Sequence, residues 1–477
     1  MHDTMTKTAL IQPDKGQNAT ELQLVNESGF ADWAKTLSDT QRAMLDGQGF
    51  TGKGYETAIV PATPGGDAPW FAVGGVADPE NLSSWCLARL AEVLPAGTYR
   101  LADREPGPAL HGWQTAQYKN TAYRSDAEPA GPRVLLTKNA KAIDPAIAEA
   151  EAVNLVRRMV DTPPEDMGPA GIEAEIETLA KAHNASLEVT RGDKLEQEYP
   201  LVHAVGRAAA REHAPRIIHL TWSPKAATKD TPVLAIVGKG VSFDSGGLDI
   251  KSSTGMALMK KDMGGAAHAI ALAKLVMEHA LPVRLHLLVP AVENAISGNS
   301  LRPGDIVKSR KGLTVEITNT DAEGRLILAD ALDRASEEYP DLIIDFATLT
   351  GAARVALGPD YPALMTRRDE TAQALIEAGR QHDDEPWRLP LPAIYVEWLE
   401  SPLADCVNAH KTGFAGASVA GLFLDKFVGK AKDGTPLDWA HFDTYGWRPA
   451  AKPGRPKGGE AYGLRASWHM LRARFGA

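Results

Sequence analysis

The stretch NTDAEGRL, residues 319–326, places two carboxylates and a guanidinium between two differently patterned segments. Residues 313–318 alternate apolar and polar side chains and are rich in β-branched residues, which predicts a strand. Residues 326–339 carry Leu, Ile and Ala at helical spacing up to Pro340, which predicts a helix. Because open α/β sheets bind ligands where strands end and helices begin, this stretch predicts an α/β fold with a site at that edge.

The two carboxylates of this stretch allow two interpretations. Asp321 and Glu323 lie two positions apart, so on extended backbone their side chains point the same way. Two like charges held together are unfavourable unless a cation or a proton joins them. Alternatively, both are ordinary first-turn acids that offset the helix dipole, with Arg325 as an exposed partner. This segment alone leaves both interpretations open.

Length and composition limit the classes of protein to which the chain can belong. A chain of 477 residues is expected to form about two or three domains. Its net charge of −10 argues against general binding to nucleic acid or to anionic membranes. The two cysteines exclude a cysteine-rich zinc site and are typical of a reducing compartment. With neither a secretory signal nor a membrane-spanning apolar run visible, we expect a cytoplasmic protein.

The chain is expected to contain a small N-terminal α/β domain, residues 1–142, and a larger α/β domain, residues 143–477. Residues 125–133 are expected to act as a linker. In the first domain we expect strands at 55–60 and 70–73 and a helix at 82–94. In the second, helices at 145–160, 170–183 and 264–279 alternate with strands at 186–189, 216–221, 232–237, 284–289 and 342–346. Such alternation predicts a mostly parallel central sheet covered by helices.

Two further motifs carry charged residues at the expected ends of elements. GKGVSFDSGG, residues 238–247, contains Lys239 and Asp244 but matches neither a phosphate-binding loop, nor a dinucleotide fingerprint, nor a nucleophile elbow. The alternative is a strand-end turn with a surface lysine. KKDMGG, residues 260–265, places Asp262 before the helix at 264–279. It is either a functional carboxylate or a simple N-cap.

A charge argument unites these motifs. Asp244, Asp262, Asp321 and Glu323 contribute four negative charges, which two divalent metal ions would balance. No histidine lies in these motifs, so the donors are hard oxygens and, if neutral, the amine of Lys239. Such a donor set suits Mn²⁺, Mg²⁺ or Zn²⁺.

GKGVSFDSGG, Lys251, KDMGG and NTDAEGRL, in this order and at these separations, resemble the leucyl aminopeptidase family of two-metal exopeptidases. The resemblance extends from about residue 150 to 445. It implies a cytoplasmic metallo-aminopeptidase, whose second domain is catalytic and cleaves the N-terminal residue from peptides. It also implies a homo-hexamer.

The resemblance implies a role for each site residue. One metal ion would be held by Lys239, Asp244, Asp262 and Glu323, and the second by Asp244, Asp321 and Glu323. Lys251 would stabilise the oxyanion, and Arg325 would hold a bicarbonate ion that acts as the base. Met259, Thr348 and Gly351 would line the pocket for the first side chain.

The chain departs from the family near its C-terminus, where Tyr462 stands in a motif of smaller residues and is expected to reshape that pocket. The basic segment at 448–459 is expected to be a solvated loop. Two other functions remain as alternatives: a two-metal phosphoester hydrolase, and a DNA-binding or architectural protein. The preferred N-terminal residue and the physiological metal are left open.

Overall fold

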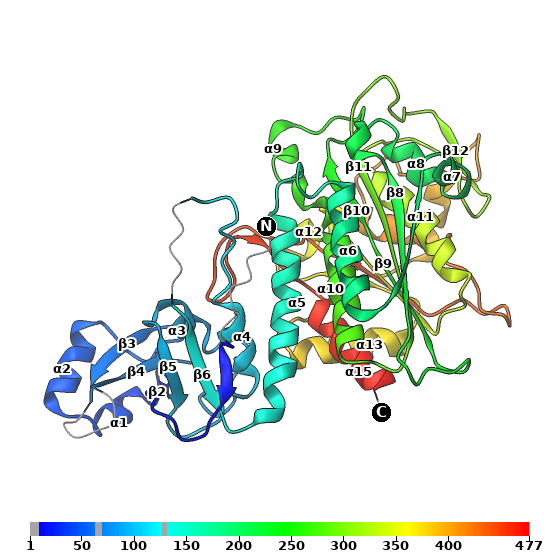
Figure 1. Ribbon diagram of the computed structural model, residues 1–477. Coiled ribbons are helices and arrows are strands. Elements are labelled where there is room, and N and C mark those ends of the chain that lie inside the picture. Colours follow the sequence, from blue (N-terminus) through cyan, green and yellow to red (C-terminus); the bar gives the residue numbers. More distant parts are fainter. Residues whose placement is uncertain (1–8, 63–68, 126–130, 477) are drawn as a thin grey trace. The chain divides into compact units, whose positions relative to one another are not determined.

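The computed structural model describes residues 9–62, 69–125 and 131–476, and Figure 1 shows its elements. One compact unit comprises the described residues up to Asn154 with Ala450–Lys457, and the other comprises Leu155–Pro449 with Gly458–Ala477. The expected division after residue 142 stays a prediction. Helix α5, Ile143–Asp161, begins one residue later. Most of the expected linker, residues 126–130, lies outside the described residues.

The first unit is built on a six-stranded sheet in the order β1-β6-β5-β2-β4-β3. The strands are β1 (Ile11–Pro13), β2 (Thr20–Val25), β3 (Thr57–Pro61), β4 (Trp70–Gly75), β5 (Gly97–Leu101) and β6 (Arg133–Thr137). Only β3 and β4 pair antiparallel. Neighbouring residues of β4 enter different cores, Ala72 with Trp113 and Val73 with Phe50, because strand side chains alternate between faces.

Four helices accompany this sheet: α1 (Phe30–Ala34), α2 (Asp39–Gly47), α3 (Ala88–Val93) and α4 (Leu110–Thr115). Helix α3 is shorter than the helix expected at 82–94. Its first residues instead form a turn, in which the side chain of Ser83 accepts a hydrogen bond from the backbone N–H of Trp85. Serine side chains that bond the local backbone in this way compete with helix formation.

The basic segment is not the solvated loop that was expected. Its residues 450–457 belong to the first compact unit. The backbone N–H of Gly454 donates to Glu92, and the guanidinium carbon of Arg455 lies 4.5 Å from the centre of the Trp85 ring. The stacking of arginine on an indole ring explains why this charged segment packs against protein rather than extending into water.

The second unit contains a nine-stranded sheet in the order β16-β15-β18-β14-β9-β11-β8-β7, with β10 also paired to β11. The strands are β7 (Ser186–Arg191), β8 (Arg216–Trp222), β9 (Val233–Gly238), β10 (Gly240–Asp244), β11 (Arg284–Asn294), β14 (Leu342–Ala347), β15 (Ala363–Met365), β16 (Trp387–Arg388) and β18 (Trp439–Asp443). The central strands β18, β14, β9 and β11 are parallel, and antiparallel pairs occur toward the edges. Every residue of β9 and β14 is buried, as expected for strands covered on both faces.

Helices cover both faces of this sheet (Figure 1). Helices α6 (Pro169–His183) and α10 (Gly264–Glu278) pack together on one face, and α8 (Pro200–Gly206) and α11 (Glu323–Ser336) pack together on the other. The second glycine of KKDMGG allows α10 to approach β14 closely, because a Cβ on Gly265 would lie 2.2 Å from the carbonyl oxygen of Phe346. The predicted α/β fold, with its mostly parallel and helix-covered sheet, is therefore confirmed.

The second unit contains further elements. They are the helices α7 (Gly192–Glu198), α9 (Ser253–Met256), α12 (Gly351–Leu357), α13 (Asp369–Gln381), α14 (Gly416–Asp425) and α15 (Leu464–Phe475), and the strands β12 (Ile306–Lys308), β13 (Thr314–Glu316), β17 (Cys406–Val407), β19 (Trp447–Arg448) and β20 (Gly458–Gly459). Within the described chain, no helix combines the length and the apolar character needed to cross a membrane.

The strand that precedes NTDAEGRL, β13, is shorter than the strand expected at 313–318. It belongs to a small three-stranded sheet with β12 and β17 rather than to the main sheet. With only three residues, β13 is too short to show in sequence which sheet it joins. The ends of β9, β10 and β14, together with the first turn of α11, form the site.

Candidate metal centre

The acidic residues of the three motifs come from three different elements of the second unit. Asp244 is the last residue of β10, and Glu323 is the first residue of α11. Asp262 lies in a 3₁₀ turn, Met259–Met263, immediately before α10. Asp262 is not the N-cap of that helix, since Met263 occupies the cap position. The N-cap alternative for Asp262 is therefore wrong.

These three carboxylates form one buried group. One oxygen atom from each of Asp244, Asp262 and Glu323 lies within 4.8 Å of the others, and all three side chains are buried. It is the only such group of three or more potential metal ligands among the described residues. Asp321 lies outside this group. The structure therefore brings together three of the four carboxylates on which the charge argument depends.

Lys239 lies between two members of this group, directly after β9. Its Nζ is 2.7 Å from Asp262 Oδ2 and 3.0 Å from Glu323 Oε1, and it donates a hydrogen bond of 3.0 Å to the carbonyl oxygen of Thr348. Burial alone would lower the pKa of Lys239, but the surrounding carboxylates raise it above its ordinary value. In the metal-free chain Lys239 is thus a charged counter-ion rather than the neutral amine that metal binding requires.

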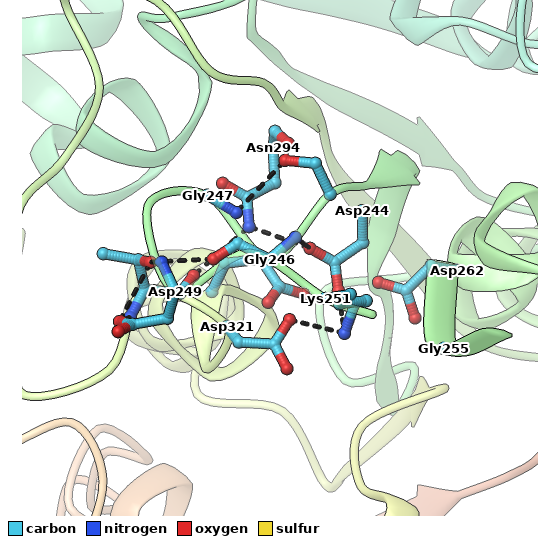
Figure 2. A network of polar contacts seen from close by, with 12 residues as sticks. Asp244, Gly246, Gly247, Asp249, Lys251, Gly255, Asp262, Asn294 and Asp321 are labelled. Atoms are coloured by element: carbon cyan, nitrogen blue, oxygen red, sulfur yellow. Dashed lines mark hydrogen bonds and ion pairs between the residues drawn. The ribbon is translucent and has the colours of Figure 1, made fainter. Parts of the chain in front are cut away.

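Lys251 is likewise a counter-ion, for Asp244 and Asp321 (Figure 2). Its Nζ lies 2.8 Å from Asp244 Oδ2 and 2.5 Å from Asp321 Oδ1. Burial opposes the charge on Lys251, but Asp244 and Asp321 raise its pKa. Figure 2 also shows the side-chain amide of Asn294, at the end of β11, donating to Asp244 Oδ1 at 2.8 Å. This bond leaves Oδ2 of Asp244 for a cation.

The donor set fits hard divalent cations. Four carboxylates face two lysines, so the cluster keeps an excess of negative charge. Burial first, and then the charge of Asp244, raises the pKa of Glu323 above its ordinary value. Its Oε2 atom is buried and has no hydrogen-bond partner. A buried carboxylate oxygen without a donor indicates that a cation belongs there, and carboxylate oxygens are the ligands that Mn²⁺, Mg²⁺ and Zn²⁺ accept.

Arg325, in the first turn of α11, lies beside the carboxylates and lines the same cavity. Its Nη1 donates a hydrogen bond of 2.8 Å to the carbonyl oxygen of Asn408, whereas its buried Nε has no hydrogen-bond partner. Burial lowers the pKa of Arg325 to about 10, so the side chain remains a cation near neutral pH. It is not the exposed first-turn partner that the alternative interpretation requires.

The cavity over this cluster has a volume of about 780 Å³. Met259, Thr348 and Gly351, the residues expected to line the first side-chain pocket, are all part of its wall. The hydroxyl of Thr348 also donates to Asp262 Oδ1 at 2.8 Å.

Tyr462 was expected to reshape the pocket for the first side chain, but it does not line the cavity. Tyr445 lines the cavity, whereas Tyr462 is absent from its described lining. The ring of Tyr462 is buried, and its hydroxyl donates to Asp360 at 3.3 Å. The expectation that Tyr462 reshapes the pocket therefore has no support in its position.

Several contacts that shape the centre were not found from the sequence, although Thr348 itself was expected in the pocket wall. Asn294 and the hydroxyl of Thr348 each bind one of the buried carboxylates. Gly324 also contributes, because a Cβ at that position would lie 2.5 Å from Cε of Lys239. Asn294 lies in none of the motifs, whereas Gly324 lies within NTDAEGRL. Its place directly after Glu323 was the one available signal.

Comparisons with known proteins agree with this geometry. Residues 154–467 match the catalytic domain of the cytosol aminopeptidase family, and residues 20–135 match the N-terminal domain of M17 aminopeptidases. A probable cytosol aminopeptidase from Leifsonia xyli is 37% identical over 454 residues, which cover 90% of each chain.

Two solved structures share the fold. The crystal structure of a cytosol aminopeptidase from Coxiella burnetii has a TM-score of 0.89 and 43% identity, and the match covers 98% of this chain and 100% of that one. The bottromycin maturation enzyme BotP in complex with Mn has a TM-score of 0.83 and 30% identity, over 98% and 100% of the two chains.

Proposed function

The chain belongs to the cytosol aminopeptidase family, and on this premise we propose that it releases N-terminal residues from peptides with the aid of two divalent metal ions. The single observation that supports this best is the buried group formed by Asp244, Asp262 and Glu323. Buried like charges are unstable without cations, so the cost of assembling them favours a metal centre over a structural role. Mn²⁺ is the first candidate, since the related BotP binds it, with Zn²⁺ and Mg²⁺ as alternatives.

We assign the two ions to overlapping sets of ligands. Lys239, Asp244, Asp262 and Glu323 would hold one ion, and Asp244, Asp321 and Glu323 would hold the other. The ions, when bound, would lower the pKa of a water molecule and polarise the scissile carbonyl. With the ions bound, Lys239 and Lys251 would no longer be needed to neutralise the carboxylates. Lys239 would then lose its proton to become a ligand, and Lys251 would be freed from Asp244 and Asp321.

Lys251 and Arg325 would act on the reacting groups without binding metal. Lys251 lines the cavity next to Asp244 and remains a cation, which suits it to stabilise a developing oxyanion. Arg325 cannot act as a base because it stays protonated. Its unpaired Nε and its place in the first turn of α11 suit an anion, and we assign this position to bicarbonate, which would accept the proton of the attacking water.

The substrate's position follows from the same geometry. The free α-amine would lie near the carboxylates, and the first side chain would lie against Met259, Thr348 and Gly351. An acylated amine has no lone pair to offer a cation, so blocked peptides should not be cleaved. This requirement would make the enzyme an exopeptidase.

The proposal is tested with purified full-length protein loaded with Mn²⁺. A panel of dipeptides and aminoacyl anilides should be hydrolysed at the first peptide or amide bond, and N-acetylated forms of the same compounds should not be. Metal analysis of the same preparation should find two ions per chain. If no panel member is cleaved, the proposal is wrong. Hydrolysis of p-nitrophenyl phosphate instead would favour a phosphoester hydrolase, and retardation of DNA in a gel at moderate salt would favour a DNA-binding role.

We further propose a homo-hexamer in the cytoplasm. The relatives are named cytosol aminopeptidases, and the chain matches both family domains over most of its length. We also keep the division into an N-terminal domain at 1–142 and a catalytic domain at 143–477. Light scattering behind size-exclusion chromatography measures the oligomeric mass directly, and a value equal to one chain would contradict the hexamer.

A further inference from the structure

Two cations on the cavity wall have no role in the proposed reaction. Lys261 is buried and directly precedes Asp262, and Arg354 lies on α12, three residues after Gly351. Both line the cavity. Neither forms an ion pair with any residue that the structure describes. In a chain with a net charge of −10, cations left without carboxylate partners beside an acidic cluster require an explanation.

Tyr445 brings these two cations together. The Nζ of Lys261 lies 4.9 Å from the centre of the Tyr445 ring, and the guanidinium carbon of Arg354 lies 5.1 Å from it. The Nη1 of Arg354 also lies 3.4 Å from the Tyr445 hydroxyl. An aromatic ring stabilises a cation without neutralising it, so both side chains keep their charge for an anion.

The backbone around these residues is held in place. The carboxylate of Asp443, two residues before Tyr445, accepts hydrogen bonds from the backbone N–H groups of Leu349 and Thr350 and from the hydroxyl of Thr350. Thr350 caps the N-terminus of α12. The strand end that carries Tyr445 is thereby tied to the start of the helix that carries Arg354, so the aromatic ring and the guanidinium are positioned before a ligand arrives.

These cations lie on the side of the cavity assigned to the first side chain. Gly351 and Arg354 are three residues apart on α12, and residues at this spacing lie on the same face of a helix. Lys261 is joined to the same wall, because the neighbouring Asp262 accepts a hydrogen bond from Thr348. Arg325, the cation assigned to the base, contacts Asn408 instead.

We infer that Lys261, Tyr445 and Arg354 form a subsite for a carboxylate, and that the enzyme favours peptides whose first residue is glutamate or aspartate. The inference rests on the proposed peptidase function and specifies its substrate class. A planar guanidinium binds a carboxylate through two parallel hydrogen bonds, and Lys261 adds a second positive charge. The excess negative charge of the chain repels acidic peptides in general, so local cations are needed to hold such a side chain.

The test compares three tripeptides on the Mn²⁺-loaded full-length protein: Glu-Ala-Ala, Gln-Ala-Ala and Leu-Ala-Ala. Glutamine has nearly the same shape as glutamate but no charge, so the ratio of their kcat/KM values reports the charge alone. We expect glutamate to exceed glutamine by roughly 10- to 100-fold, the range of a hydrogen bond between charged groups. Equal rates for the two, or faster cleavage of the glutamine peptide, would overturn the inference.

Variants connect this ratio to the subsite. Arg354→Gln and Lys261→Met should each lower the glutamate-to-glutamine ratio, and Arg354→Lys should lower it less than Arg354→Gln. Arg354→Glu should move the preference toward Lys-Ala-Ala. Arg302→Gln, which removes an exposed arginine outside the cavity lining, is the control and should leave the ratio unchanged. A ratio that does not change in Arg354→Gln would also overturn the inference.

A binding measurement separates this inference from the proposed function. Calorimetric titration of the Mn²⁺-loaded protein with L-glutamate and L-glutamine measures the subsite without turnover. If no peptide is cleaved but glutamate binds more tightly than glutamine, and Arg354→Gln removes the difference, the subsite is supported and the peptidase proposal fails. If leucine peptides are cleaved but glutamate shows no advantage in binding or in rate, the peptidase proposal stands and the subsite fails.

Discussion

The hydroxyl of Thr348, just beyond the end of β14, donates a hydrogen bond of 2.8 Å to Oδ1 of Asp262, in the turn before α10. These residues are 86 positions apart in the chain. The bond fixes the orientation of a carboxylate whose other oxygen lies 2.7 Å from Lys239. Hydrogen bonds of this kind orient metal ligands, so the relationship links the wall of the substrate cavity to the proposed metal centre.

Replacing Thr348 with valine should weaken metal binding without unfolding the protein. Valine has the shape of threonine but cannot hold Asp262 in place, and we expect the affinity for Mn²⁺ to fall by about 10- to 100-fold. Titration of the metal-free protein with Mn²⁺ measures this change. Thr348→Ser keeps the hydroxyl and serves as the control. Equal affinities for the valine and serine variants would show that the bond has no such role.

Glu323→Gln should prevent stabilisation by metal while leaving the metal-free protein at least as stable as the parent. Burial and the neighbouring Asp244 disfavour the charged form of Glu323, so a neutral glutamine should fit the metal-free cluster at least as well. In the parent, Mn²⁺ at about 100 times its Kd should add about 2.7 kcal/mol to the free energy of unfolding. Melting curves with EDTA and with Mn²⁺ test both statements. An equal rise in Tm for parent and variant would exclude Glu323 as a ligand.

Glu323→Ala and Asp244→Ala should both abolish metal binding and activity, because the two carboxylates are assigned to both ions. Metal analysis by mass spectrometry and a peptide hydrolysis assay on the same samples provide the measurement. A variant that retains both ions with normal turnover would require a different ligand assignment.

Lys251→Ala should keep both metal ions yet lose most of the turnover. Lys251 pairs with Asp244 and Asp321, and in the proposed assignment the ions would take its place, so metal content should remain at the parent level. Without its charge on the oxyanion, kcat should fall by about 100- to 1,000-fold. Near-normal rates in a fully loaded variant would rule out the oxyanion role.

Gly324→Ala should disturb the centre by displacing Lys239. The added Cβ would lie 2.5 Å from Cε of a buried lysine held by three partners, so overpacking should cost about 1–3 kcal/mol and weaken metal binding. Gly298→Ala is the matched control, since a Cβ there meets no atom within 4 Å. Urea unfolding of the two variants compares them. Similar stabilities would mean that Lys239 moves aside at little cost.

His268 should make the protein less stable at acidic pH. Its Nδ1 donates to the carbonyl oxygen of Gly264, its Nε2 accepts from the backbone N–H of Tyr462, and burial lowers its pKa from 6.5 to about 4. Between pH 4 and 6.5 the unfolded chain therefore binds a proton that the folded chain does not. The stability from this group is complete above pH 6.5 and is lost as the pH falls toward 4.

At pH 5 the loss from His268 amounts to about 2 kcal/mol. Urea unfolding at pH 5 and pH 7.5 of the parent and of His268→Asn measures it, with EDTA present to remove the contribution of metal. The difference in stability between the two pH values should be smaller in the variant. An identical pH dependence would show that other groups determine the acid sensitivity.

The sequence was sufficient to predict the class of fold and the charged residues that line one cavity, whereas their chemical roles stay a prediction. A buried parallel strand such as β9 is recognisable because its apolar residues run without interruption, and the charged motif that follows it stands out by contrast. The sequence did not indicate which sheet β13 joins, because three residues carry too little pattern to show this. It also failed for Tyr462, which lies buried away from the cavity, because only packing separates a core ring from a cavity wall.

The sequence by itself thus determined the possible donors of the candidate centre. Carboxylates and a lysine can be recognised as donors from residue type alone, before anything is known of how the chain folds. Tertiary structure alone decided how those donors are held and charged. Thr348 and Arg354 line the cavity, and Asn294 binds Asp244 beside it. They come from strand ends and a helix that are distant in sequence, and no spacing rule connects them. The pKa of a lysine or a carboxylate depends on how much water remains around it and on which charges lie within a few ångströms, and both quantities exist only once the chain has folded.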